Sequence, residues 1–141
     1  MVTDDRGDAV ERVHRGLSLF SRRVRGEARE VHPGMTYVDY SLLTIVAATP
    51  GMSSAEVAEA AHIDKSTASR QLNGLVDRGM LARQTVGGRR RPLRLTESGM
   101  VALSDADQAQ RRQIGERMRN WTPDDIMTFA DLLERYNSAL G

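Results

Sequence analysis

Apolar residues recur at heptad spacing near both ends of the chain. Near the start they fall three, four, three, four and seven residues apart, at Val10, Val13, Leu17, Phe20, Val24 and Val31. Near the end the spacing is three, four, three and four, at Ile126, Phe129, Leu133, Tyr136 and Leu140. Such stripes are typical of helices that pack lengthwise against another helix. We therefore predict one helix from about Asp8 to Val31 and another that begins after Thr122, where a proline and two carboxylates follow the capping threonine.

Two short helical segments follow in the middle of the chain. Residues 37–49 form an apolar helical pattern that a proline and a glycine end. The next segment, Ser53-Ser-Ala-Glu56, is a capping box with apolar residues on either side in the positions of a hydrophobic staple. We predict a buried helix at residues 37–49 and a second helix from Ser53 to Ala61.

A third helix is predicted after a tight turn at residues 62–64. Asp64 can cap a helix that runs from Lys65 to Arg78 and that Gly79 closes. Its apolar side carries Ala68, Leu72, Leu75 and Val76. Its opposite side carries Ser66, Arg70, Asn73 and Asp77. One face can therefore pack against a core while the other remains free to meet a ligand.

A small hairpin and a long helix complete the pattern. Residues 81–85 and 92–95 are strand candidates with inward-pointing leucines, and Gly87-Gly88 lies between them. Thr96 can cap a long polar helix that reaches about Asn120. The predicted fold is mainly α with a small two- or three-stranded β wing, in one unit of residues 1–141. A winged helix-turn-helix lobe at 36–99 is flanked by dimerisation helices at 8–35 and 100–141.

The charge is distributed unevenly along a chain of one domain's length. The net charge is only +1, yet residues 62–96 carry eight basic and two acidic residues, and both flanks are mildly acidic. A basic block between acidic ends is expected where only that block meets a polyanion. The chain has no cysteine, which excludes disulfides, thiolate metal sites and thiol redox sensing.

A polar-faced helix after a tight turn, followed by a basic hairpin, suits duplex DNA. The second helix can enter the major groove with its N-terminal side chains at base edges, while arginines hold phosphates. The predicted DNA-binding residues are Ser54, Lys65, Ser66, Thr67, Ser69, Arg70, Asn73, Arg89, Arg90 and Arg91. The alternatives are an ordinary solvated face and a winged-helix module that binds protein or RNA without a specific operator.

The segments DKSTASRQLNGLVDRGMLAR (residues 64–83) and LTESG (residues 95–99) resemble the MarR family of bacterial transcription regulators. The resemblance implies a homodimer that binds a short DNA palindrome, as a repressor, and that a small, often aromatic ligand releases. It places the recognition helix at residues 65–78 and the wing arginine at Arg89. One departure is Gly87, where the wing of the family commonly has an aspartate that would order it.

The terminal stripes and the resemblance both predict a dimer. The predicted interface residues are Val13, Leu17, Phe20, Val24, Ile126, Phe129, Leu133 and Tyr136. The alternative is that the two terminal helices pack against each other within one chain.

The sequence gives only weak indications of a small-molecule site and none of a metal site or an enzyme. The resemblance implies an effector site between the dimer helices and the DNA-binding lobe, with His32, Tyr37 and Tyr40 as candidates, although an aromatic residue on a helix is more often part of a core. The scattered histidines predict no metal site, and no phosphate loop, HExxH pair or nucleophile elbow indicates an enzyme. Without an apolar run of membrane-spanning or signal-peptide length, we expect a cytoplasmic protein with no membrane partner and no cofactor.

Overall fold

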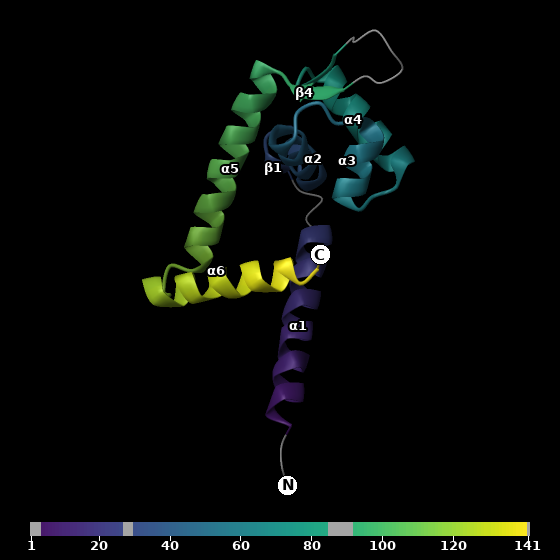
Figure 1. Cartoon of the computed structure of the whole chain (residues 1–141). Helices are drawn as coiled ribbons and strands as arrows, with labels where there is room; N and C mark the ends of the chain where they lie inside the picture. Colours follow the sequence, from purple (N-terminus) through teal and green to yellow (C-terminus); the bar gives the residue numbers. More distant parts are fainter. Residues whose placement is uncertain (1–3, 27–29, 85–91, 141) are drawn as a thin grey trace. The chain divides into compact units, whose positions relative to one another are not determined.

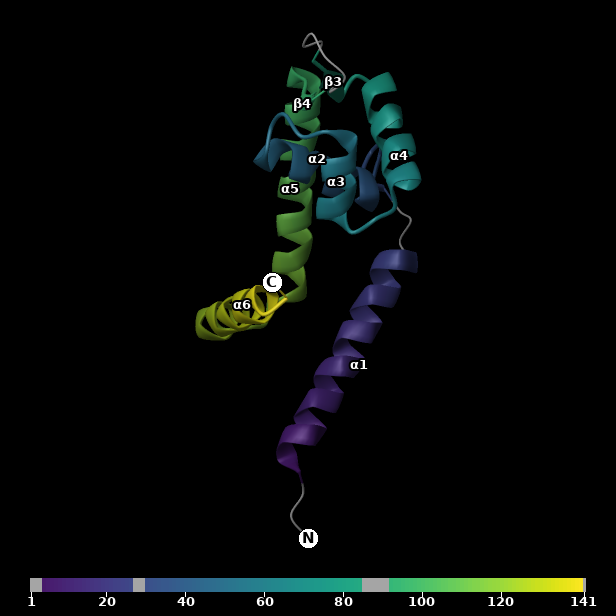
Figure 2. The same ribbon diagram turned by 45° about the vertical axis from the view of Figure 1, so that its right-hand side comes forward.

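The computed structural model describes residues 4–26, 30–84 and 92–140 (Figures 1 and 2). By its internal contacts the chain divides into two units, residues 1–106 and 107–141. The elements are α1 (Asp5–Gly26), β1 (Glu30–His32), β2 (Met35–Thr36), α2 (Tyr37–Ala48), α3 (Ser54–Ala61), α4 (Lys65–Asp77), β3 (Leu81–Arg83), β4 (Leu93–Leu95), α5 (Glu97–Arg117) and α6 (Pro123–Ser138). The mainly helical fold with a small β wing is confirmed. No helix within the described ranges is long and apolar enough to cross a membrane.

The first helix ends earlier than predicted. α1 stops at Gly26, and Val31 lies instead in β1, which pairs antiparallel with β2. Pro33 and Gly34 form the turn between these strands, and Gly34 has a φ of +79°, which favours glycine. The predicted helix boundary at Val31 was therefore wrong, because the heptad spacing runs on by coincidence into a hairpin.

A capping box begins α2. The hydroxyl of Thr36 accepts the backbone N–H of Asp39 at 3.2 Å, and the Asp39 carboxylate accepts the backbone N–H of Thr36 at 3.1 Å. The apolar pattern of residues 37–49 predicts the helix but not this box, in which aspartate stands where glutamate or glutamine is usual. The helix ends at Ala48, within one residue of the prediction, and Gly51 follows with a φ of +94°.

The predicted helix-turn-helix is present, with its predicted caps. Ser53 and Glu56 form the capping box of α3, and the hydroxyl of Ser53 accepts the Glu56 N–H at 3.2 Å. His62 ends α3 in the left-handed conformation, with a φ of 55°. Asp64 caps α4, and Gly79 follows that helix with a φ of +76°.

The wing is an antiparallel pair of strands. β3 and β4 pair in the register Leu81 with Leu95, Ala82 with Arg94, and Arg83 with Leu93. Leu81 and Leu93 are buried, as predicted. A bridge between Met52 and Leu93 adds the segment before α3 to the edge of this sheet. The predicted wing tip, with Gly87 and the three arginines Arg89, Arg90 and Arg91, lies outside the described residues.

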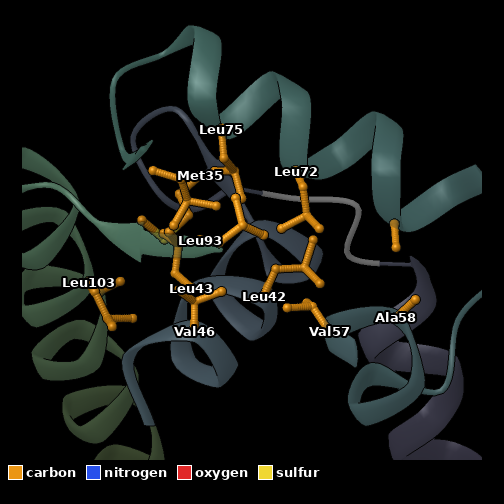
Figure 3. Close-up of a cluster of buried hydrophobic side chains, with 13 residues drawn as sticks. Met35, Leu42, Leu43, Val46, Val57, Ala58, Leu72, Leu75, Leu93 and Leu103 are labelled. Atoms are coloured by element: carbon orange, nitrogen blue, oxygen red, sulfur yellow. The ribbon is translucent and has the colours of Figure 1, made fainter. Parts of the chain in front are cut away.

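The core of the first unit lies between α2, α3, α4 and the wing strands. Figure 3 shows Leu42 of α2 between Leu72 of α4 and Val57 of α3, and Met35 and Leu93 close to Leu75 of α4. Full burial of one such side chain stabilises the fold by about 1.5–3 kcal/mol. The buried apolar residues are Met35, Leu42, Leu43, Val46, Val57, Ala58, Ala68, Leu72, Leu75, Leu81, Leu93, Leu103 and Ala106.

The first turn of α5 packs closely against the turn that follows α4. The Thr96 hydroxyl caps α5 by accepting the Gly99 N–H at 3.0 Å, and it donates to the Gly79 carbonyl. The Thr96 N–H donates to the Met80 carbonyl at 3.1 Å. A Cβ on Gly99 would lie 2.0 Å from the same Met80 oxygen. Only glycine fits this position, which gives a physical reason for the last residue of LTESG.

The second unit contains the end of α5 and all of α6. Thr122 caps α6 by accepting the Asp125 N–H at 3.1 Å, and Pro123 is the first helical residue, as predicted. The rings of Trp121 and Phe129 lie edge to face, with centroids 5.4 Å apart. In the single chain, Phe129, Leu133 and Tyr136 of the predicted stripe are exposed and Ile126 is half-buried.

The predicted stripe of α1 is likewise uncovered in the single chain. Val13, Leu17 and Phe20 are exposed, with Phe20 at 56%, and Val24 is half-buried. Because water surrounds these apolar side chains, each helix carries surface that is stabilised by contact with another apolar surface.

One ion pair connects α4 to the start of α2. Arg78 lies 3.0 Å from Asp39, whose side chain is only 3% exposed, and it also donates to the carbonyl of Gly34 in the β1–β2 turn. The other Asp39 oxygen, Oδ1, is buried without a hydrogen-bond partner among the described residues. The Arg78 guanidinium therefore supplies the main compensation for burying this carboxylate.

We expect Arg78→Met to lower the free energy of unfolding by about 1–3 kcal/mol, because it leaves the buried Asp39 carboxylate without its cation. The methionine keeps the apolar stem of the side chain. Urea unfolding at one fixed protein concentration measures the change. The control is Arg15→Met, which removes an exposed pair with Glu11 and should cost less than about 1 kcal/mol. Equal losses in the two variants would contradict the role given to Arg78.

Candidate nucleic-acid interface

The polar face of α4 is arranged as predicted. Lys65, Ser66, Arg70 and Asn73 are exposed, whereas Thr67 and Ser69 are half-buried at its edges. The opposite face contributes three buried residues to the core, Ala68, Leu72 and Leu75. Packing of the apolar side therefore turns the exposed side chains away from the core, where they can meet a macromolecular surface.

The N-terminus of α4 is already occupied by a carboxylate. Asp64 accepts the Thr67 N–H at 3.1 Å and the hydroxyl hydrogen of Ser66. These hydrogen bonds, first from Ser66 and then from Thr67, lower the pKa of Asp64 from 3.8 to about 2. Asp64 thus offsets the unfavourable position of Lys65 in the first turn of the helix. Because Ser66 donates its hydrogen to Asp64, its oxygen is left as an acceptor.

Arg83 connects three elements of the site and was not among the predicted DNA-binding residues. Its Nη1 donates to the Ser54 hydroxyl oxygen at 3.1 Å, and its Nη2 donates to the Asn73 Oδ1 at 2.7 Å. Arg83 belongs to β3, whereas its two partners belong to α3 and α4. Its sequence signals were its place in the basic block of residues 62–96 and its inward position two residues after Leu81. Neither partner could be inferred, because the contacts span 29 and 10 residues.

Positive charge in this region is concentrated in the wing rather than in α4. Lys65 and Arg70 are balanced by Asp64 at the cap and Asp77 in the last turn. The remaining basic residues include Arg83, Arg94 and the three predicted wing-tip arginines, Arg89, Arg90 and Arg91, which lie outside the described residues. A polyanion at this surface would therefore be attracted mainly by the wing segment.

An open groove of about 690 Å³ lies beside the start of α5. It is lined by His32, Glu97, Ser98, Val101, Ala102 and Asp105. The His32 Nε2 lies 3.9 Å from a carboxylate oxygen of Asp105. Of the three predicted effector residues, His32 lines this groove, whereas Tyr37 and Tyr40 form a ring pair with centroids 6.2 Å apart and do not line it. In the described part of the chain, no three His, Asp or Glu side chains are grouped to hold a metal ion.

Comparisons with known proteins point to one family. Residues 34–92 match the model of the MarR family. A Thauera aromatica protein, named as a transcriptional regulatory protein for the hcr operon, is 34% identical over 85 residues, which cover 59% of this chain and 49% of that protein. The match thus spans about half the length of this curated relative.

Solved structures share the fold. A MarR family protein from Bacillus stearothermophilus has a TM-score of 0.81 at 15% identity and covers 99% of both chains. A MarR family protein from Mycobacterium tuberculosis, solved with p-aminosalicylic acid, has a TM-score of 0.67 at 27% identity and covers 86% of this chain and 98% of that one. The same protein has also been solved with salicylic acid.

We expect the charge of Asp64 to stabilise the fold in a pH-dependent way. Because its pKa is lowered from 3.8 to about 2, the stabilisation is fully present above pH 3.8 and is lost as the pH falls through about 2. The difference in unfolding free energy between the natural protein and Asp64→Asn should therefore shrink as the pH is lowered through this range. Urea unfolding at a series of pH values measures it, and a difference that stays constant would contradict the assignment.

Proposed function

Because residues 34–92 match the MarR family model and a transcriptional regulatory protein is 34% identical over 85 residues, we propose that the chain is a MarR family member that acts as a sequence-specific DNA-binding transcription regulator and not as an enzyme. The observation that carries the proposal is the exposed polar face of α4, held by α3 and followed by a basic wing. We further propose that it represses transcription from a short palindrome, as a homodimer.

In this proposal α4 enters the major groove. Lys65, Ser66 and Arg70, in its N-terminal half, meet base edges, where Arg70 can make a bidentate contact with guanine. Thr67 and Ser69 lie at the edges of this face. The wing arginines Arg89, Arg90 and Arg91 contact phosphates or the adjacent minor groove.

We expect Arg70→Ala to weaken binding to a duplex that covers the promoter upstream of the protein's own gene. A lost bidentate base contact costs about 1–3 kcal/mol, whereas binding to an unrelated duplex should change little. Fluorescence anisotropy with excess competitor DNA, at two salt concentrations, measures the affinity for the promoter duplex and for the unrelated duplex. The control is Arg112→Ala, which removes an exposed arginine of α5.

The same titration discriminates between the two classes of function. A regulator forms a complex on the promoter duplex that survives the competitor. A winged-helix module for protein or RNA shows only weak binding that salt removes and that does not depend on DNA sequence. The second outcome would overturn the proposed function.

The uncovered stripes of α1 and α6 support the proposed homodimer. They place exposed apolar side chains at heptad spacing on two helices, among them Phe20 and Phe129. A second copy of the chain is the partner that family membership favours. In a two-fold dimer, the two copies of α4 would lie one DNA turn apart, roughly 34 Å.

We expect Phe129→Glu to shift the protein towards the monomer at micromolar concentration, because a charge would be buried among apolar side chains. Size-exclusion chromatography with light scattering measures the mass. The control is Thr128→Glu, which adds the same charge beside the stripe. A natural protein that is monomeric under these conditions would overturn the dimer and favour packing of the terminal helices within one chain.

We also propose that a small aromatic effector binds the groove at His32 and releases the protein from DNA. Support comes from the Mycobacterium tuberculosis relative, solved with p-aminosalicylic and salicylic acids. Glu97 and Asp105 line the groove of this chain and oppose a ligand carboxylate, so a neutral phenol should bind better than salicylate.

Thermal-shift measurements with phenol and salicylate at millimolar concentration test the effector. We expect phenol to raise the melting temperature more than salicylate does, and His32→Ala to reduce the rise. The control is His14→Ala in α1. The absence of any shift would favour a regulator that binds DNA constitutively.

A further inference from the structure

Arg83 reaches the DNA-facing surface from the inner face of the wing sheet. In the β3–β4 register Arg83 pairs with the buried Leu93, so their side chains lie on the same face of the sheet. From this face the guanidinium extends to the hydroxyl of Ser54 and the amide of Asn73. Arg94 pairs with Ala82, one residue along, and lies on the opposite face.

The direction of these hydrogen bonds fixes what the two partners can offer to a ligand. A guanidinium has only donors, so the Ser54 oxygen and the Asn73 Oδ1 must both accept from Arg83. The hydroxyl hydrogen of Ser54 is then free to donate elsewhere. The amide oxygen of Asn73 accepts from Arg83, which leaves its NH₂ group available as a donor. Because their oxygens are bonded to Arg83, both side chains can act as hydrogen-bond donors towards a ligand.

A set of donors beside a guanidinium matches a phosphate better than a base edge. Phosphate oxygens only accept hydrogen bonds, whereas base edges in the major groove present donors as well as acceptors. Asn73 lies eight residues after Lys65 in α4, about 12 Å along the helix axis from the end that reads bases. Ser54 begins the helix that crosses the DNA backbone in a helix-turn-helix complex.

We infer that Arg83 is a positioning residue that holds Ser54 and Asn73 as paired donors to one backbone phosphate of duplex DNA. This inference rests on the proposed function. Ser54 and Asn73 consequently contribute affinity and the register of docking, and carry no base preference themselves. Ser66, whose oxygen Asp64 leaves as an acceptor, is excluded from this phosphate contact.

The test is Arg83→Lys, which keeps the charge but loses the planar fork that holds two partners. We expect affinity to fall about three- to tenfold, by the same factor for the promoter duplex and for an unrelated duplex. Arg112→Lys makes the same chemical change at an exposed arginine of α5 that the proposal assigns no contact, and it should leave affinity unaltered. Circular dichroism and the urea midpoint confirm that each variant is folded.

Two further readouts separate positioning from a general structural effect. In the natural protein, Asn73→Ala should weaken binding about three- to tenfold, whereas in the Arg83→Lys background it should add little. Replacing single phosphates of the duplex by neutral methylphosphonates should reveal one position that weakens the natural protein and not Arg83→Lys. Inorganic phosphate at millimolar concentration, used as a competitor, shows whether the site binds the free anion without the duplex.

The outcomes distinguish this inference from the proposed function. A natural protein that fails to bind the promoter duplex specifically would overturn the function, and the inference with it. Specific binding by the natural protein with unchanged affinity in Arg83→Lys, or losses in Arg83→Lys and Asn73→Ala that multiply, would overturn the inference alone. A change in base preference in Arg83→Lys would also overturn it, because the contact would then be with a base.

Discussion

Burial of one side of α4 determines the geometry of the whole surface proposed to face DNA. The helix has only 13 residues, too few to be stable by itself in water. Ala68, Leu72 and Leu75 are fully covered, and Figure 3 shows Leu72 and Leu75 directed into the core. The polar face is what remains after this side is packed. The leucines therefore decide which polar side chains a ligand can meet, although none of them would touch it.

Two arginines form hydrogen bonds that hold α4 in place outside its buried apolar side. Arg78, which follows the last turn of the helix, binds Asp39 and the carbonyl of Gly34, and Arg83 binds Asn73 in its third turn. Each guanidinium reaches partners on two separate segments, which the single ammonium of a lysine would do less well. Packing of the leucines does not fix the rotamer of a polar side chain on the other face, whereas these hydrogen bonds do.

Structural features that depend on a few neighbouring residues could be predicted from the sequence. The caps at Ser53, Asp64 and Thr122 involve residues two or three positions apart, and the two faces of α4 follow from helical periodicity. The hairpin before α2 was missed because heptad spacing continued by chance to Val31. The arginine contacts could not be predicted, because the Arg78 bond to Gly34 joins residues 44 positions apart and only the folded chain brings them together. For the same reason the predicted interface contained Asn73 without the arginine that orients it.

Where the wing joins the rest of the chain, its two strands are held together by a hydrogen bond between residues on either side of the tip. The Gln84 N–H donates to the Pro92 carbonyl at 2.9 Å, and Thr96 holds the start of α5 against Gly79. Any segment inserted between Gln84 and Pro92 begins and ends at points that are already adjacent, so doubling its length costs only about 0.6 kcal/mol. The Gln84–Pro92 bond and the Thr96 contacts therefore allow the sequence and length of the intervening segment to change without altering the helices beside it.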